Sequence, residues 1–318
     1  MLKKTLAFAT AAAIGLGALA GCTASAASQT PTVDKVAVTY VTSPLNVPSI
    51  TERKIGAFAD AFGDHVDVTY SELTTGPEQT AALASGDIQF LFAVGATSVI
   101  LSAANGADIA IVDMYSRSPK AFMLVSGADG PKSPADLVGK TIAGPKGTIL
   151  HELLLAYLAS GGYTADDVHF VDMAIPDAQA ALAGGSVDVA LLAGPAASTM
   201  LTDGYHKVTD GNGLVGATIV VATTRKFAEA HPEIVRTFRK AHQSVVDYMD
   251  AHPDKVVGMT AAKTGLSEAA VRDMLPTYDF NTEITPADIA AMSATDDFMV
   301  ANGMIDKAVD VKSLILPQ

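Results

Sequence analysis

Glycine and hydroxyl residues gather at four points of this sequence where a strand is expected to lead into a helix. These points are Thr75-Gly76, the Gly-Ala-Thr-Ser run at 95–98, Gly147-Thr148 and Gly194-Pro195. The first N–H groups of a helix lack partners within it, and the helix dipole is positive there, so each turn is a candidate anion-binding site. Thr97 and Thr148 could equally cap their own helices. The prediction therefore depends on several of these turns meeting in one cleft.

Arg117, at the end of an expected strand, is the candidate cation, because a guanidinium can bind a sulfonate or carboxylate through two parallel hydrogen bonds. It could equally be a solvated surface arginine. None of the catalytic motifs that we searched for fits this sequence. The G-x-G-x-x-G match at 211–216 precedes a strand, whereas the dinucleotide-binding motif follows one. His151-Glu152 lacks a second histidine at the spacing of a zinc-protease motif, and the seven histidines show no metal-binding spacing. We therefore predict a binding protein that is not an enzyme and holds no cofactor or metal.

The elements that position these turns are encoded twice. The segment PEQTAALASGDIQFLFAVG at 77–95 is repeated 99 residues later as PDAQAALAGGSVDVALLAG at 176–194. In each copy a proline and an acidic residue open a helix, a glycine ends it, and an apolar strand follows. The repeat predicts two similarly built α/β lobes that present helix N-termini at the carboxyl ends of their strands, where open α/β sheets bind ligands.

The order of elements predicts how the chain divides. Strands alternate with helices, including one helix over 49–62, and the pattern from Lys226 onward is helical. Apolar extended runs at 121–126 and 218–223 predict two crossings between lobes. We assign residues 34–121 and 224–318 to lobe I and residues 122–223 to lobe II. Two crossing strands make a hinge with a cleft between the lobes.

The N-terminus predicts export. Lys3 and Lys4 precede an apolar run at 6–20, which is typical of a signal peptide over 1–21. The Leu-Ala-Gly-Cys string ending at Cys22, the only cysteine, resembles the bacterial lipoprotein box and implies lipidation of Cys22. The alternative is ordinary cleavage near 24–27. Residues 22–33 are small and polar and predict a flexible lipidated tether.

The net charge of the chain limits the classes of macromolecule that it could bind. The 318 residues carry a net charge of −13, and no cluster of lysine or arginine follows Lys4. Nucleic acids and anionic membrane surfaces both attract basic clusters, so neither is an expected partner. We expect a monomer whose membrane contact is the lipid anchor at Cys22.

The run SPADLVGKTIAGPKGTILHELLLAYLASGGYTADDVHFVDM at 133–173 resembles the second-lobe opening of the nitrate/sulfonate/taurine family of ABC-importer substrate-binding proteins. The repeats at 82–87 and 181–189 resemble the A-L-x-x-G-x-I-D pattern of that family. The resemblance extends over about 36–316. It implies an α/β fold of the periplasmic-binding type, a two-lobed clamshell in which each lobe is a mixed sheet flanked by helices and two crossing strands form the hinge.

Carried over by position, the resemblance implies ligand contacts from the segments 43–46, 76–77, 96–98, 147–151 and 194–195. With the cation added, the predicted site residues are Ser43, Asn46, Gly76, Thr97, Ser98, Arg117, Gly147, Thr148, His151 and Pro195. Tryptophan is absent, and Pro44-Leu45-Asn46 replaces a polar glycine-rich turn. Both departures from the family pattern affect the expected identity of the ligand more than the expected fold.

We predict an exported protein, lipid-anchored at the outer face of the cell membrane or in the periplasm. It would capture a small organic anion, a sulfonate or a taurine-like molecule, and deliver it to ABC permease subunits. One alternative is a neutral or aromatic precursor, such as a pyrimidine or a vitamin-like ligand. Others are a sensor or adhesin that lost transport, and a fold-related small-molecule lyase. Such a lyase would be cytoplasmic, which the export signal argues against.

Overall fold

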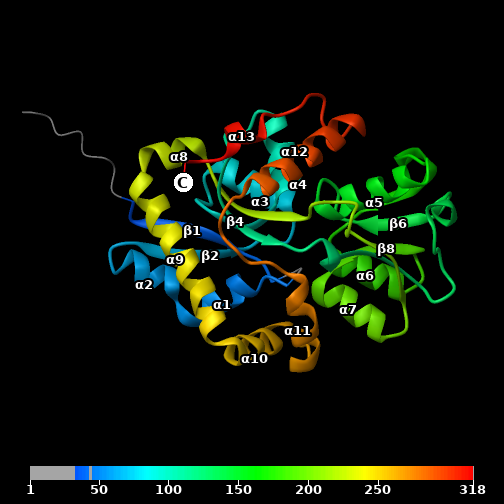
Figure 1. Cartoon of the computed structure of the whole chain (residues 1–318), viewed down its shortest axis with the longest axis horizontal. Helices are drawn as coiled ribbons and strands as arrows, with labels where there is room; N and C mark the ends of the chain where they lie inside the picture. Colours follow the sequence, from blue (N-terminus) through cyan, green and yellow to red (C-terminus); the bar gives the residue numbers. More distant parts are fainter. Residues whose placement is uncertain (1–32, 43–44, 318) are drawn as a thin grey trace, which may run out of the picture. The chain divides into compact units, whose positions relative to one another are not determined.

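The structure, a computed structural model, describes residues 33–42 and 45–317 (Figure 1). The predicted signal peptide at 1–21, the lipidated Cys22, almost all of the tether and Ser43 lie outside the described residues. Within the described part, no helix is both long enough and apolar enough to cross a membrane.

One group of strands comes mostly from the first third of the chain. Its members are β1 (Lys35–Tyr40), β2 (Asp67–Glu72), β3 (Leu91–Gly95), β4 (Ala110–Arg117) and β10 (Thr218–Thr223). β1 and β2 are parallel, while β10 lies between β3 and β4 and is antiparallel to both. The Phe90 N–H donates to the Ala37 carbonyl at 3.1 Å, and the Thr39 N–H donates to the Phe90 carbonyl at 3.0 Å. These bonds place β1 beside the start of β3, which gives the order β2-β1-β3-β10-β4.

The second sheet has five strands and repeats that order. Its members are β5 (Phe122–Ser126), β6 (Thr141–Gly144), β7 (His169–Asp172), β8 (Val189–Ala193) and β9 (His206–Asp210). The order is β7-β6-β8-β5-β9, with β6 parallel to both neighbours and β5 antiparallel to both of its own. β5 therefore occupies the position that β10 has in the first group. Each group takes its fourth strand from a chain crossing, at the two runs where the sequence predicts crossings.

The return crossing differs from the predicted boundary. The sequence-based division places 218–223 in lobe II, but β10 is hydrogen-bonded to β3 and β4, and all six of its residues are buried. A central strand with two neighbours is satisfied only within its own sheet. In hydrogen bonding, β10 therefore belongs with residues 34–121.

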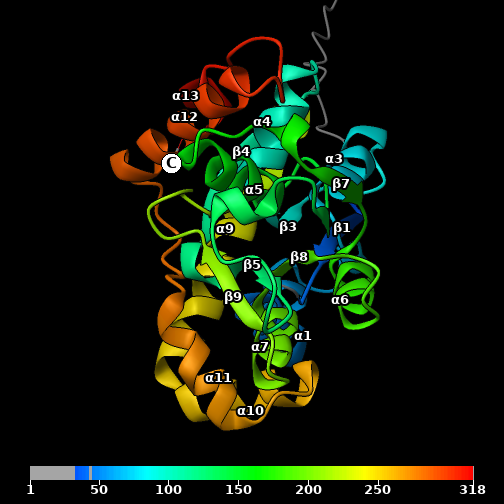
Figure 2. The same cartoon turned by 90° about the vertical axis from the view of Figure 1, so that its right-hand side faces the viewer.

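Helices cover both faces of each sheet (Figure 2). On the second sheet, α5 (Ile149–Ser160) lies on one face, and α6 (Ile175–Ala183) and α7 (Gly194–Thr202) lie on the other. On the first group, α3 (Gly76–Ser85) and α4 (Ala96–Ala104) share a face. The repeated segments thus form α3-β3-α4 and α6-β8-α7, which confirms the prediction of two similar α/β units.

The expected single helix over 49–62 is wrong. The structure has α1 (Val47–Ile55) and α2 (Ala57–Phe62), separated at Gly56. Gly56 has a φ of 73°, and its N–H donates to the Glu52 carbonyl, so it ends α1 in the left-handed conformation that glycine adopts without strain.

The chain from Arg225 onward is helical, as predicted, and packs on the first group of strands. Its helices are α8 (Arg225–Ala230), α9 (Pro232–Ala251), α10 (Pro253–Thr264), α11 (Glu268–Met274), α12 (Pro286–Ala301) and α13 (Val311–Leu314). Phe238 of α9 is fully buried and stacks on Phe90 with ring centroids 4.0 Å apart. α12 closes the opposite face against α4 and β10.

Candidate functional site: a pocket at helix N-termini

A cavity of about 70 Å³ lies where the first turns of five helices meet, and we call it the inner pocket. Asn46, Gly95 and Thr148 line it and immediately precede α1, α4 and α5. Gly76 and Ile175 also line it and are the first residues of α3 and α6. These five helices follow β1, β3, β6, β2 and β7, so the pocket lies at the carboxyl ends of parallel strands.

The side chains around the inner pocket are neutral. Among the described residues that line it there is no Asp, Glu, Lys, Arg or His. Apolar walls come from Phe122 at the start of β5, Ile219 on β10 and Ile149 on α5, with hydroxyl and amide groups between them. The net electrostatic character is therefore set by the backbone. Each helix contributes about half a positive charge at its N-terminus.

The N-termini of α4 and α5 are open to an anion. Neither Gly95 nor Thr148 caps its helix through a side-chain hydrogen bond, and the Thr148 hydroxyl instead donates to the Pro145 carbonyl at 2.8 Å. By contrast, Thr75 and Glu78 cap α3 reciprocally, so the Glu78 carboxylate serves its own helix. The first-turn N–H groups of α4 and α5 could therefore donate hydrogen bonds to the oxygen atoms of a ligand.

Contacts between the two sheet units hold α4 against α5. The Ser98 hydroxyl donates to the Gly147 carbonyl at 2.8 Å. The Thr97 hydroxyl donates to the Glu152 carboxylate at 2.5 Å, and Thr295 of α12 donates to the other carboxylate oxygen at 2.8 Å. Glu152 is only 4% exposed, and burial raises its pKa above the ordinary value. Thr97 therefore does not line the inner pocket but joins the two helices behind it.

His151 lies behind the pocket and is uncharged at neutral pH. Its ring packs against Phe170 with centroids 4.9 Å apart, and its Nδ1 accepts from the Gly147 N–H at 3.4 Å. Burial, with Lys146 nearby, lowers the pKa of His151 to about 4. His151 thus supports the turn at Gly147 and brings no cation to the site.

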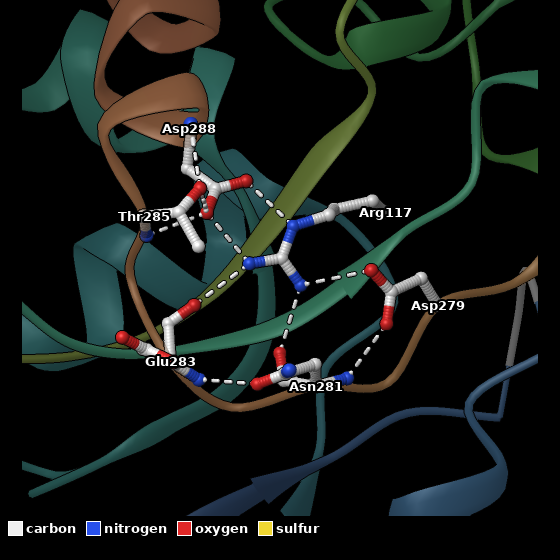
Figure 3. Close-up of polar contacts among 6 residues, drawn as sticks. All are labelled: Arg117, Asp279, Asn281, Glu283, Thr285 and Asp288. Carbon is white, nitrogen blue, oxygen red and sulfur yellow. Dashed lines mark hydrogen bonds and ion pairs between the residues drawn. The ribbon is translucent and has the colours of Figure 1, made fainter.

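Arg117 does not line the inner pocket. Its guanidinium instead faces Asp288, Asp279 and the loop before α12 (Figure 3). Its Nε and Nη2 donate to the two carboxylate oxygens of Asp288 at 2.5 and 2.6 Å. The remaining N–H groups donate to the carboxylate of Asp279 and to the carbonyls of Asn281 and Glu283. All five N–H donors of the guanidinium are therefore used, so the role expected of Arg117 as a ligand cation is replaced by that of fixing the loop before α12. Burial alone would raise the pKa of Asp288, but hydrogen bonds from Arg117 and Thr285 hold it below its ordinary value.

The predicted residues therefore separate into groups. Asn46, Gly76, Ser98 and Thr148 line the inner pocket. Thr97, Gly147 and His151 lie in the contacts just behind it, and Pro195 lines an adjoining outer cavity.

Sequence reasoning missed several lining residues. Ile175 lies at the position of Gly76 shifted by the 99-residue repeat, so the repeat could have identified it. Ala93 has a φ of 82° where β3 pairs irregularly with β10, and Phe122 and Ile219 enter from the crossing strands. No local signal marks these three. Among the described residues, no group of three or more His, Cys, Asp or Glu side chains could hold a metal ion.

Two mixed sheets with the same strand order, joined by two chain crossings and with a pocket at helix N-termini, define the periplasmic-binding class of fold. The chain belongs to the NMT1/THI5 like family, whose model matches residues 63–256. It is 31% identical over 261 residues to the taurine-binding periplasmic protein of Escherichia coli, which covers 79% of this chain and 78% of that protein.

Solved structures agree on the fold. The alkanesulfonate-binding protein of Xanthomonas axonopodis pv. citri, solved bound to MOPS, superposes with a TM-score of 0.82 at 24% identity, covering 89% of this chain and 98% of that one. A desulfurization enzyme also matches, with a TM-score of 0.67 at 18% identity over 90% of this chain and 97% of its own. The fold alone thus hosts both binding and catalysis.

Proposed function

We propose that this protein is the solute-binding component of an ABC importer and that it binds a sulfonate through its anionic head in the inner pocket. The observation that carries the proposal is a neutral pocket at which the N-termini of α1, α3, α4, α5 and α6 meet, with no described carboxylate in its lining. An anion there is attracted by the helix dipoles and meets no negative side chain. The family and the taurine- and alkanesulfonate-binding relatives support the same substrate class.

A sulfonate suits this geometry better than a planar carboxylate. Its three oxygens diverge from one sulfur, so they can accept hydrogen bonds from different helix N-termini at once, including those of α4 and α5. The carbon next to the sulfur would then contact the apolar side chains of Phe122 and Ile219. No cationic side chain is required, because several desolvated N–H groups and aligned dipoles share a single negative charge.

Closure of the two lobes is the proposed mechanism. Residues 34–121 with 224–318 supply α1, α3 and α4, and residues 122–223 supply α5 and α6. A ligand that contacts helices of both lobes binds the closed conformation more tightly than an open one. It therefore shifts the equilibrium toward the closed conformation by that difference in affinity. Ser98–Gly147 and Thr97–Glu152 are the protein's own contacts across the same closure. The permease would recognise the closed form.

Export and anchoring at Cys22 are part of the proposal. In a bacterial host that processes lipoproteins, the wild-type chain should fractionate with membranes and require detergent for release. Cys22→Ser should abolish that association, whereas Ser25→Ala, a nearby control, should leave it intact. Membrane association of Cys22→Ser equal to that of the wild type would contradict the anchor.

A thermal-shift screen tests the substrate class. The protein is melted with alkanesulfonates, taurine, nitrate, carboxylates and pyrimidines, each at the same excess. A ligand at a hundred times its Kd adds about 2.7 kcal/mol of stability, which raises Tm by several degrees for a chain of this size. The proposal predicts that sulfonates give the largest shifts. Shifts confined to pyrimidines or other neutral compounds would favour the alternative ligand class. The supporting observation for that class is that no described residue lining the pocket has a cationic side chain.

A further inference from the structure

Glu152 on α5 is a buried acid whose hydrogen-bond partners are two hydroxyl groups. Thr97 donates to one carboxylate oxygen at 2.5 Å, Thr295 donates to the other at 2.8 Å, and Glu152 is 4% exposed. A carboxylate removed from water is costly unless charge or several donors compensate, so burial favours the protonated form. Burial accordingly raises the pKa of Glu152, and the two hydroxyl groups offset only part of that rise.

The elements around Glu152 bring no cation to it. α5 packs against α4, β5, β8 and the short 3₁₀ helix Pro134–Leu137, and α12 contacts its carboxylate. None of these described elements contains a lysine or an arginine. Their other acidic residues are Asp136, Asp288, Asp296 and Asp297. The first three accept hydrogen bonds from Ser133, Arg117 and Val309 respectively, and the fourth is exposed. Burial and the two hydroxyl groups therefore set the pKa of Glu152.

The partners of Glu152 come from the other side of the proposed lobe division. Thr97 and Thr295 belong to residues 34–121 and 224–318, whereas Glu152 belongs to residues 122–223. Opening of the lobes would separate the carboxyl from both hydroxyl groups and admit water to it. The neighbouring His151 differs, because its contacts with Gly147 and Phe170 both lie within residues 122–223 and are kept when the lobes separate.

We propose that Glu152 is a positioning residue that couples ligand binding to proton uptake: the closed form holds a proton from solvent on the Glu152 carboxyl, and the protein binds its ligand more tightly as the pH falls. One of the two threonine hydroxyl groups then accepts a hydrogen bond instead of donating one. This inference rests on the proposed function, because it takes closure around a sulfonate as the binding step. A sulfonate stays ionised at these pH values, so the ligand itself does not exchange the proton.

The direction of the pH dependence follows from linkage. An acid whose pKa is higher in the closed form than in the open form favours closure most below its ordinary pKa of about 4.3. That contribution is lost as the pH rises through the raised pKa of the closed form, and above it the affinity levels off. Within this window the affinity falls by up to about tenfold per pH unit, the limit for one proton.

Calorimetric titration of the full protein with 1-propanesulfonate between pH 4.5 and 8 tests the inference. Titrations in two buffers with different ionisation enthalpies measure the protons taken up, which should peak within the same window. Glu152→Gln removes the titration, and its amide can still pair with both hydroxyl groups. This variant should bind with one affinity across the range and take up no proton. Thr295→Val removes a donor to the carboxylate and should move the fall in affinity to higher pH.

Asp296→Asn is the matched control. Asp296 is 3% exposed and burial raises its pKa as well, but its partner is the Val309 N–H, within the same stretch of residues 224–318. Closure leaves that contact unchanged, so the variant should keep the wild-type pH dependence. His151→Gln removes the titratable group next to Glu152 and should keep the dependence too.

The outcomes separate the two proposals. If the sulfonate binds with one affinity at every pH and without proton uptake, the proton coupling is overturned while the sulfonate site stands. If Glu152→Gln keeps the pH dependence, or His151→Gln abolishes it, the proton binds elsewhere and the inference fails. If 1-propanesulfonate binds at no pH, the proposed function fails, and the inference fails with it. Thermal melts without ligand establish that each variant is folded at each pH. If Glu152→Gln does not fold, the result for Thr295→Val decides.

Discussion

Thr97 on α4 and Glu152 on α5 are joined by a buried hydrogen bond of 2.5 Å, with the Thr97 hydroxyl as donor. The bond connects two of the helices whose N-termini lie at the inner pocket without a side-chain cap. Thr295 of α12 donates to the same carboxylate, so a single buried acid fixes three helices relative to one another. The distance between the N-termini of α4 and α5 thus depends on Glu152, although Glu152 does not line the pocket.

The first prediction concerns the pH dependence of stability. Because burial raises the pKa of Glu152 in the folded chain, the folded state holds this proton more tightly than the unfolded state. The contribution of Glu152 is most favourable below its ordinary pKa and is lost as the pH rises through the raised value. Glu152→Gln removes this titration and keeps a neutral polar group. The Tm of Glu152→Gln minus that of the wild type should therefore increase with pH above about 4.3 and then level off. A difference that does not change from pH 4 to 8 would contradict the assignment.

The second prediction concerns Arg117. Arg117→Met leaves the carboxylate of Asp288, which is 4% exposed, without its cationic partner. Losing one partner of a buried ion pair costs about 3–5 kcal/mol of folding free energy, measured by denaturant unfolding. Arg272→Met is the control, because Arg272 and its partner Asp254 have side chains 47% and 86% exposed, and it should cost less than about 1 kcal/mol. Where Arg117→Met is folded, sulfonate affinity should stay within about threefold of the wild type. A selective loss of sulfonate binding with unchanged stability would restore the ligand role first expected of Arg117.

The third prediction concerns the close approach of α3 and α4. A Cβ at position 76 would lie 2.1 Å from the Ser98 Oγ and 2.6 Å from the Ser98 Cβ. Ser98 is buried and bonded to Gly147, so Gly76→Ala must displace one of the helices that line the pocket. We expect a loss of about 1–3 kcal/mol of stability and weaker sulfonate binding. Gly127→Ala, where no atom lies within 4 Å of the added Cβ, should change neither.

A double variant sharpens this third prediction. Ser98→Gly removes the atoms that the new Cβ would meet, so Gly76→Ala with Ser98→Gly should be more stable than the sum of the two single changes implies. Strict additivity in denaturant unfolding would show that the steric contact is not the cause.

The fourth prediction concerns the N-terminus of α5. Thr148→Asp places a carboxylate at the N-cap, where an acidic side chain satisfies the first-turn N–H groups and favours the helix. The variant should fold at least as stably as the wild type, yet its carboxylate takes the donors that the ligand needs and repels the sulfonate. We expect sulfonate affinity to fall by about tenfold or more. Thr148→Asn, a neutral N-cap of the same size as Asp, should retain affinity within about threefold, and titration calorimetry compares the two. Equal binding by both variants would rule out an anion at this helix end.

Much of the lining of the candidate site could be predicted because its signals are local. The sequence has a threonine or a glycine at the expected start of a helix at Thr75-Gly76 and at Gly147-Thr148. In the structure these turns lie at the inner pocket or directly behind it. The meeting of the turns is a property of sheet packing, which is why Pro195 lines the outer cavity instead. Arg117 could not be interpreted locally, because its partners Asp279 and Asp288 lie 162 and 171 residues further along the chain.

The fold could be predicted further than the site. The 99-residue repeat gave the paired helix–strand–helix units, and the extended runs at 121–126 and 218–223 gave the crossings. The sheet to which β10 belongs depends on its pairing with β3 and β4, which are distant in the sequence. The periodicity of apolar residues identifies a strand but does not indicate which strands it pairs with. The break at Gly56 was missed because a glycine within a helical pattern can either be tolerated or end the helix.

The central claim is that helix N-termini, without a cationic side chain, hold the negative charge of the ligand. It is tested most directly by titrating the protein at pH 7 with 1-propanesulfonate and with 1-propanesulfonamide, which has nearly the same shape but no charge. The dipoles of several partly buried helices acting on one charge predict that the sulfonate binds at least about tenfold more tightly. Equal or tighter binding of the neutral sulfonamide would contradict the account.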